Sequence, residues 1–163
     1  MHPNDKIFSD LNVLRTTCVN FARHGETRVL TSGCFDLVHG GHLEYLCRAK
    51  ALASFRGKLV VGINSDEFVR RLKGPNRPVR KEADRAFVMA GFFPVDAVIV
   101  FNDDLELIRA VRPDIYVASA TSHVRVHDDP PRLALLHELA TKIVEVDSGK
   151  TDSTSDIIKR SAK

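Results

Sequence analysis

Short apolar runs alternate with longer amphipathic segments along this chain, and the alternation constrains the fold more than any other feature of the sequence. Residues 58–64, KLVVGIN, form a largely apolar run, as expected of a strand buried on both faces. Comparable runs predict strands at residues 28–32, 96–101, 114–118 and 143–146. Strands that alternate with helices need crossover connections, which produce a parallel sheet covered on both sides. We therefore predict a Rossmann-like, doubly wound α/β fold with five parallel strands.

The segments between these runs are predicted to be helices and polar loops. Residues 9–23 carry apolar side chains at helical spacing, namely Leu11, Leu14, Cys18 and Phe21. Further helices are expected at residues 41–55, 65–72, 81–92, 104–111, 132–140 and 153–161. A chain of 163 residues suits one domain, so we expect a single domain with a leading helix within residues 1–27 and a Rossmann-like core over residues 28–163.

Composition excludes several classes of protein. The formal net charge of +3 is small and scattered, which argues against a nucleic-acid partner but suits an anionic small substrate. The 3 cysteines include no short Cys-x-x-Cys pair, so a disulfide framework and a zinc site are not expected. No apolar run is long enough to span a membrane, and the first ten residues lack a signal-peptide core. We expect a cytoplasmic protein with no membrane partner.

A glycine-rich turn with two histidines, GCFDLVHGGH, follows the first predicted strand at residues 33–42. Its glycines let the backbone approach a ligand, and the helix beginning near Gly41 offers N–H groups and a positive dipole end to phosphate. His39 and His42 are three residues apart, so at a helix entry both side chains can point the same way. Imidazoles there can donate hydrogen bonds to phosphate oxygens, where charge gathers during phosphoryl or nucleotidyl transfer. The pattern favours a functional site over a helix start with two incidental histidines.

This turn resembles the G-x-F-D-x-x-H-x-G-H signature of the cytidylyltransferase-like (HxGH) nucleotidyltransferases. The chain is most similar to the adenylyltransferase domains of bacterial ADP-heptose synthases, which act on D-glycero-β-D-manno-heptose 1-phosphate in lipopolysaccharide core biosynthesis. The stretches that carry this resemblance are TSGCFDLVHGGH at residues 31–42, VGINSDEFVRRLKGPNRP at 61–78, Glu82 to Arg85, residues 95–101, and Arg-Pro-Asp at 112–114. They are distributed over most of the chain.

The resemblance implies roles for individual residues. His39 and His42 would contact the nucleotide phosphates and stabilise the pentacoordinate α-phosphorus, and Lys73 would reach phosphate from the basic loop at residues 73–80. Asp36 would shape the turn and orient a histidine. Arg85 would bind the acceptor or the triphosphate, with an ion pair to Glu82 as the alternative. Other residues expected to bind the nucleotide are Gly33, Cys34, Phe35, Asp36, Gly41, Ser153, Thr154 and Ser155.

The chain departs from the resembled domains in one loop. They usually carry Lys-Gly-Gly-Asp-Tyr after the fourth strand, whereas this chain has ASATSH at residues 118–123. Ser119 and His123 of this segment are expected to face the substrate. His123, Arg125 and His127 form either a substituted anion site or part of an ordinary polar loop. The alternative for Lys73 and Arg77 is that they are solvated charges of the basic loop.

We therefore expect an enzyme that transfers a nucleoside monophosphate from a triphosphate to a phosphorylated acceptor and releases pyrophosphate. ATP and the heptose 1-phosphate are the favoured substrates, and Mg²⁺ is expected with the triphosphate, held mainly by phosphate and water oxygens. One alternative is CTP-dependent transfer to a phosphorylated polyol, amino alcohol or phosphonate, as in glycerol-3-phosphate cytidylyltransferases. Another is a nucleotide-binding module without catalysis. The resembled family is commonly dimeric, which makes the leading helix a candidate homodimer interface.

Overall fold

A single parallel sheet organises the computed structural model, which describes residues 2–120 and 126–147. Within these residues the sheet has 6 strands in the order β1-β4-β3-β2-β5-β6, and every neighbouring pair is parallel. The strands are β1 (Ile7–Phe8), β2 (Arg28–Gly33), β3 (Lys58–Asn64), β4 (Ala97–Phe101), β5 (Ile115–Ser119) and β6 (Lys142–Val146). The Rossmann-like α/β prediction is confirmed.

The predicted number of five strands is wrong, because β1 adds an edge strand before the leading helix. Ile7 pairs with Val98 and Phe8 with Ile99 on β4. Two residues are too few to produce a recognisable apolar alternation, so only their pairing with β4 identifies them as a strand.

Six α-helices connect the strands within the described residues. They are α1 (Leu11–Arg23), α2 (Gly40–Ala51), α3 (Asp66–Lys73), α4 (Glu82–Gly91), α5 (Asp104–Val111) and α6 (Pro130–Glu138). Short 3-10 turns occur at η1 (Pro3–Lys6) and η2 (Val126–Asp128). Helix α2 ends at Ala51, four residues before the predicted end, and Phe55 lies fully exposed in the following turn. The predicted helix at residues 153–161 lies outside the described residues.

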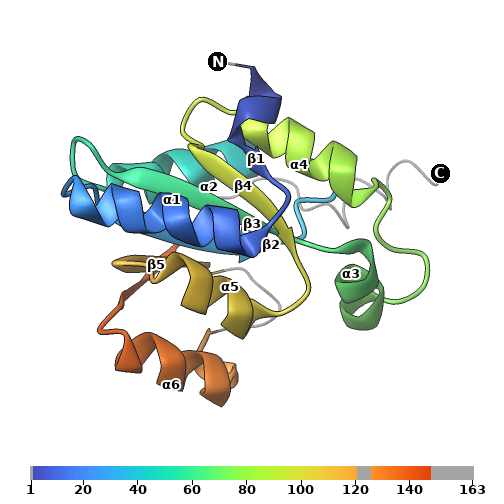
Figure 1. Ribbon diagram of the computed structural model, residues 1–163. Helices are drawn as coiled ribbons and strands as arrows, with labels where there is room; N and C mark the ends of the chain where they lie inside the picture. The colour runs from blue at the N-terminus through green and yellow to red at the C-terminus, as the bar shows by residue number, and fades with distance from the viewer. Residues whose placement is uncertain (1, 121–125, 148–163) are drawn as a thin grey trace.

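Helices cover both faces of the sheet (Figure 1) and enclose two apolar clusters. One cluster joins buried residues of α2 and α4 to the sheet, and the other joins those of α1, α5 and α6. Successive strand residues alternate between them, since Val29 belongs to the first and Leu30 to the second. This alternation follows from the two-residue period of a strand, and it explains why the central strands are apolar almost throughout.

The leading helix α1 is part of this packing. The Asp10 carboxylate caps it by accepting the N–H of Asn12 at 2.6 Å. Leu14 and Cys18 face the sheet and are buried in the cluster that includes α5 and α6. The apolar side that the sequence revealed therefore packs within the chain, which leaves only the outer face of α1 for the expected homodimer contact.

The order of the strands places the turn after β2 near the middle of the sheet, at the carboxyl ends of its strands. From β2 the chain proceeds to β3 and β4 on one side, and β5 and β6 lie on the other. Ligands of such sheets bind beyond the strand ends at this change of direction. Helix α2 is fixed there by Tyr45, whose hydroxyl accepts from Thr31 of β2 at 2.6 Å and donates to the Val117 carbonyl of β5 at 3.0 Å.

No helix of the described residues is long and apolar enough to span a membrane.

Candidate active site

The turn between β2 and α2 depends on Phe35. This residue adopts a φ of 43°, in the left-handed region that non-glycine residues seldom occupy, and its ring is buried against the α2 side of the core. A Cβ added at Gly33 would lie 3.1 Å from a ring carbon of Phe35. A side chain at residue 33 would therefore require the Phe35 ring to shift slightly, which is a reason for glycine different from the close ligand approach expected from the sequence.

His39 and His42 come together at the entry to α2. His39 is the residue before the helix, and its ring centroid lies 4.0 Å from that of His42 in the first turn. The Nδ1 atom of His42 accepts the backbone N–H of His39 at 3.3 Å. An Nδ1 that accepts a hydrogen bond leaves the proton of a neutral imidazole on Nε2. His42 thus presents an Nε2–H donor, as phosphate binding requires.

Burial, the neighbouring His39 and the Lys73 charge lower the pKa of His42 from 6.5 to about 4. The ring is consequently neutral near pH 7, and the hydrogen bond from His39 keeps its proton on Nε2. The Lys73 ammonium is therefore close enough to act electrostatically on His42. Lys73 is the last residue of α3, and Gly74, with a φ of 92°, turns the chain out of that helix.

The Asp36 carboxylate anchors the basic loop. It is 2% exposed and accepts hydrogen bonds from Arg77 Nε at 2.7 Å, from the Val79 N–H at 2.8 Å and from the Arg80 N–H at 2.9 Å. Burial acts to raise the pKa of Asp36, but the two N–H groups and the Arg77 guanidinium outweigh it and hold this pKa below its ordinary value. The hydrogen bonds of Asp36 join the turn to residues 77–80 rather than to a histidine. The alternative that Arg77 is a solvated charge is wrong for the same reason.

The Arg85 side chain is buried and bound by protein groups. Its side chain is 0% exposed, and its guanidinium donates to the Cys34 carbonyl at 2.6 Å, the Arg80 carbonyl at 3.0 Å and Asp66 Oδ1 at 2.8 Å. The alternative ion pair with Glu82 is wrong in its partner, since Glu82 instead accepts the Asp66 N–H at 2.6 Å. We assign Arg85 a positioning role, because it joins the turn after β2 to the basic loop and to the start of α3.

Several expected site residues are placed only in part. Ser119 ends β5 in register with Val146, and Cys34 is half-buried with its carbonyl bound to Arg85. His127 lies in η2, with Nε2 3.9 Å from a Glu145 carboxylate oxygen. The remaining expected residues, His123, Arg125, Ser153, Thr154 and Ser155, lie outside the described residues.

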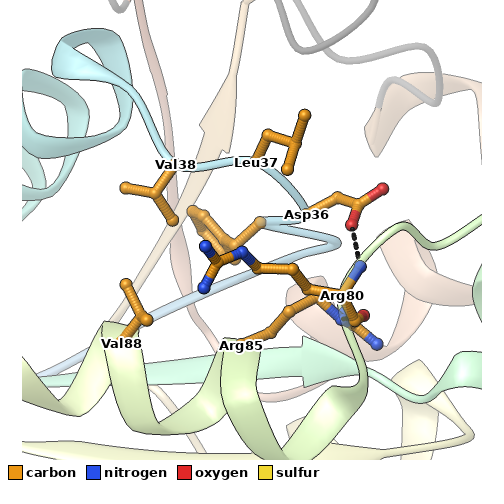
Figure 2. Close-up of a pocket in the computed structure, with 7 residues that line it drawn as sticks. Asp36, Leu37, Val38, Arg80, Arg85 and Val88 are labelled. Atoms are coloured by element: carbon orange, nitrogen blue, oxygen red, sulfur yellow. Dashed lines mark hydrogen bonds between the residues drawn. The ribbon is translucent and has the colours of Figure 1, made fainter. Parts of the chain in front are cut away.

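A pocket of about 390 Å³ adjoins the turn after β2. Its lining residues are Phe35, Asp36, Leu37, Val38, Arg80, Arg85 and Val88. Figure 2 shows that the turn forms one wall and that α4, with Val88, forms the opposite wall. Sequence reasoning did not single out Arg80 or the pocket. The only available signal was that Arg80 ends the basic loop KGPNRPVR.

This geometry can be compared with that of known proteins. Residues 30–160 match the family model described as Cytidylyltransferase-like. The chain belongs to the cytidylyltransferase-like family. The match confirms the predicted resemblance and the nucleotidyltransferase class, and it includes the turn, the basic loop and the pocket of this cytidylyltransferase-like chain.

Relatives of this cytidylyltransferase-like chain include proteins named bifunctional protein HldE. The one from Campylobacter jejuni is 42% identical over 134 residues, which cover 81% of the chain and 27% of the relative. The one from Methylobacillus flagellatus is 39% identical over 160 residues, which cover 97% of the chain and 31% of the relative. The chain thus spans about three tenths of the length of these relatives. A crystal structure of the lipopolysaccharide core biosynthesis protein from Thermoplasma volcanium GSS1 superposes with a TM-score of 0.61 at 27% identity, covering 77% of this chain and 98% of that one.

Among the described residues, no group of three or more His, Cys, Asp and Glu side chains is placed to hold a metal ion. The Asp36 carboxylate, three residues before His39, already binds the loop at residues 77–80.

Proposed function

We propose that this chain transfers a nucleoside monophosphate from a nucleoside triphosphate to a phosphorylated acceptor. The observation that carries the proposal is the His39–His42 pair, with ring centroids 4.0 Å apart at the start of α2. ATP and D-glycero-β-D-manno-heptose 1-phosphate are the proposed substrates. Support for them comes from the sequence resemblance and from the relatives named bifunctional protein HldE.

The reaction is a direct displacement. A phosphate oxygen of the acceptor attacks the α-phosphorus, a new P–O bond forms, and the bond to the β-phosphate breaks as pyrophosphate leaves with the electron pair. Negative charge that builds on the α-phosphate oxygens is met by the Nε2–H of His42, by N–H groups at the start of α2 and by the Lys73 ammonium. Mg²⁺ bound with the triphosphate would neutralise charge on the departing pyrophosphate.

Pyrophosphate release tests this function. Purified chain is incubated with ATP or CTP and with heptose 1-phosphate or glycerol 3-phosphate, and pyrophosphate is measured in each combination. ATP with the heptose 1-phosphate is expected to give the highest kcat/KM. Preference for CTP with glycerol 3-phosphate would support the cytidylyltransferase alternative, and release in no combination would support a nucleotide-binding module without catalysis.

The role of the histidine pair is tested by His42→Ala. Loss of a preorganised donor to transition-state charge is expected to lower kcat by about 10²- to 10³-fold. His137→Ala, which removes an exposed histidine of α6, is the matched control and is expected to keep wild-type turnover. A folded His42→Ala variant with near-normal turnover would contradict the proposed mechanism.

A further inference from the structure

Arg80 is held by its backbone and extends its side chain across the pocket. Its N–H donates to Asp36 Oδ1 at 2.9 Å, and its carbonyl accepts from Arg85 Nε at 3.0 Å. Figure 2 shows the Arg80 side chain running between Val38 and Val88, whereas Arg85 runs the other way, towards the Arg80 backbone. The N–H and the carbonyl of Arg80 are thus fixed by the buried side chains of Asp36 and Arg85. These contacts fix the position from which the Arg80 side chain extends.

The Arg80 guanidinium differs from those of its neighbours in having no protein partner among the described residues. Arg77 is bound to Asp36, and Arg85 is bound to Cys34, Arg80 and Asp66. No ion pair or side-chain hydrogen bond of Arg80 occurs within residues 2–120 and 126–147. Its five N–H donors remain available in a fork that matches a phosphate in two parallel hydrogen bonds.

The rest of the lining offers little else to a charged or polar ligand. Phe35, Leu37, Val38 and Val88 are apolar, and the Asp36 carboxylate faces the basic loop. The Arg85 side chain is 0% exposed, and each of its three guanidinium nitrogens already donates a hydrogen bond within the chain. Phe35 also connects the pocket to the histidines, because its ring centroid lies 5.4 Å from that of His42. The Phe35 ring therefore separates a ligand in this pocket from His42 of the proposed reaction centre, and Arg80 is the available cation.

We propose that Arg80 binds the phosphate of the acceptor and that the apolar walls of the pocket contact the carbon skeleton attached to that phosphate. This inference rests on the proposed function for its assignment to the acceptor. It assigns the acceptor contact to Arg80, a residue outside the histidine signature, in place of Arg85. Arg80 acts as a substrate-binding residue, and the pocket favours a phosphate monoester whose adjoining carbon atoms can contact an apolar surface.

The assignment to the acceptor is tested with Arg80→Gln in the pyrophosphate assay, using the triphosphate and acceptor that the wild-type chain prefers. Loss of a charge-assisted, two-bond contact is expected to raise the acceptor KM about 10- to 100-fold, with the triphosphate KM unchanged. Arg80→Lys keeps the positive charge but not the forked pair of donors, so its acceptor KM is expected to lie between those of the wild type and Arg80→Gln. Arg109→Gln, at an exposed position on α5, is the matched control. An acceptor KM that is equal in Arg80→Gln and Arg109→Gln would overturn the assignment.

A binding titration that needs no turnover separates this inference from the proposed function. Phenyl phosphate, which combines a phosphate with an apolar ring, is titrated into the wild-type, Arg80→Gln and Arg109→Gln proteins, and phenol serves as the uncharged probe. We expect at least tenfold weaker phenyl phosphate binding only in Arg80→Gln, and weak phenol binding throughout. Equal affinity of the two variants, or phenol binding as tightly as phenyl phosphate, would refute the role of Arg80 even if the chain releases pyrophosphate. Selective loss in Arg80→Gln would support the anion site even if no pyrophosphate is released.

Discussion

Replacing Asp36 by Asn is expected to destabilise the fold by about 3 kcal/mol. The wild-type Oδ2 atom contacts Arg77 Nε and Nη2, both at 2.7 Å, while Oδ1 accepts the N–H groups of Val79 and Arg80. An asparagine keeps one acceptor oxygen but places an NH₂ donor against other donors, so the ion pair is lost. Breaking a buried pair costs about 3–5 kcal/mol, and Arg77, at 15% exposure, can recover some hydration, which favours the lower end.

Urea unfolding followed by circular dichroism measures this change, with Asp84→Asn on the exposed side of α4 as the matched control. The pKa of Asp36 is lower in the folded chain than its ordinary value of 3.8, so its stabilisation is present above that value and is lost as pH falls below it. The difference between wild type and Asp36→Asn should therefore be constant from pH 5 to 8 and shrink in more acidic solution. A difference below about 0.5 kcal/mol at pH 7, within the range of ordinary surface substitutions, would refute this account of the loop anchor.

Three further predictions concern the histidine site and the core. Because the pKa of His42 falls from 6.5 to about 4 on folding, the unfolded chain takes up the proton first as the pH is lowered. The free energy of unfolding of the wild-type chain should therefore decrease by about 3 kcal/mol as the pH falls from 6.5 to 4. His42→Gln should flatten this pH dependence in urea unfolding, and an unchanged slope would contradict the assignment. Lys73→Met should raise the pKa of His42 in an NMR titration and lower kcat at least tenfold. Gly62→Ala would place a Cβ 2.5 Å from Leu107 Cδ2, which should cost about 1–3 kcal/mol in unfolding free energy, whereas Gly91→Ala, with no atom within 4 Å, should cost far less.

The arrangement of strands and helices could be predicted because it depends on local apolar periodicity. The run at residues 58–64 coincides with β3, since a strand buried on both faces has to be apolar almost throughout. Element ends were harder to predict. Helix α2 stops at Ala51, where the apolar spacing alone allowed it to continue, and the two residues of β1 become a strand only by pairing with β4.

The candidate site divides in the same way between local and distant contacts. His39 and His42 are close in sequence, so the pattern of one turn was enough to predict that they lie together. The contact between Asp36 and Arg77 spans 41 residues, and that between Arg85 and Cys34 spans 51. No periodicity encodes such pairs, which is why the sequence left a solvated Arg77 open and did not identify the partners of Arg85.

Cationic side chains that sequence reasoning grouped together have separate tasks in the folded chain. Lys73 acts electrostatically on His42, Arg77 neutralises Asp36, and Arg80 reaches into the pocket. Asp36 is shared between the last two, because it binds the Arg77 guanidinium and the Arg80 N–H with one carboxylate. The turn that carries the histidines therefore also fixes the backbone from which Arg80 extends. A change in that turn should alter acceptor affinity together with phosphate stabilisation, whereas a change at the Arg80 guanidinium should alter acceptor affinity alone.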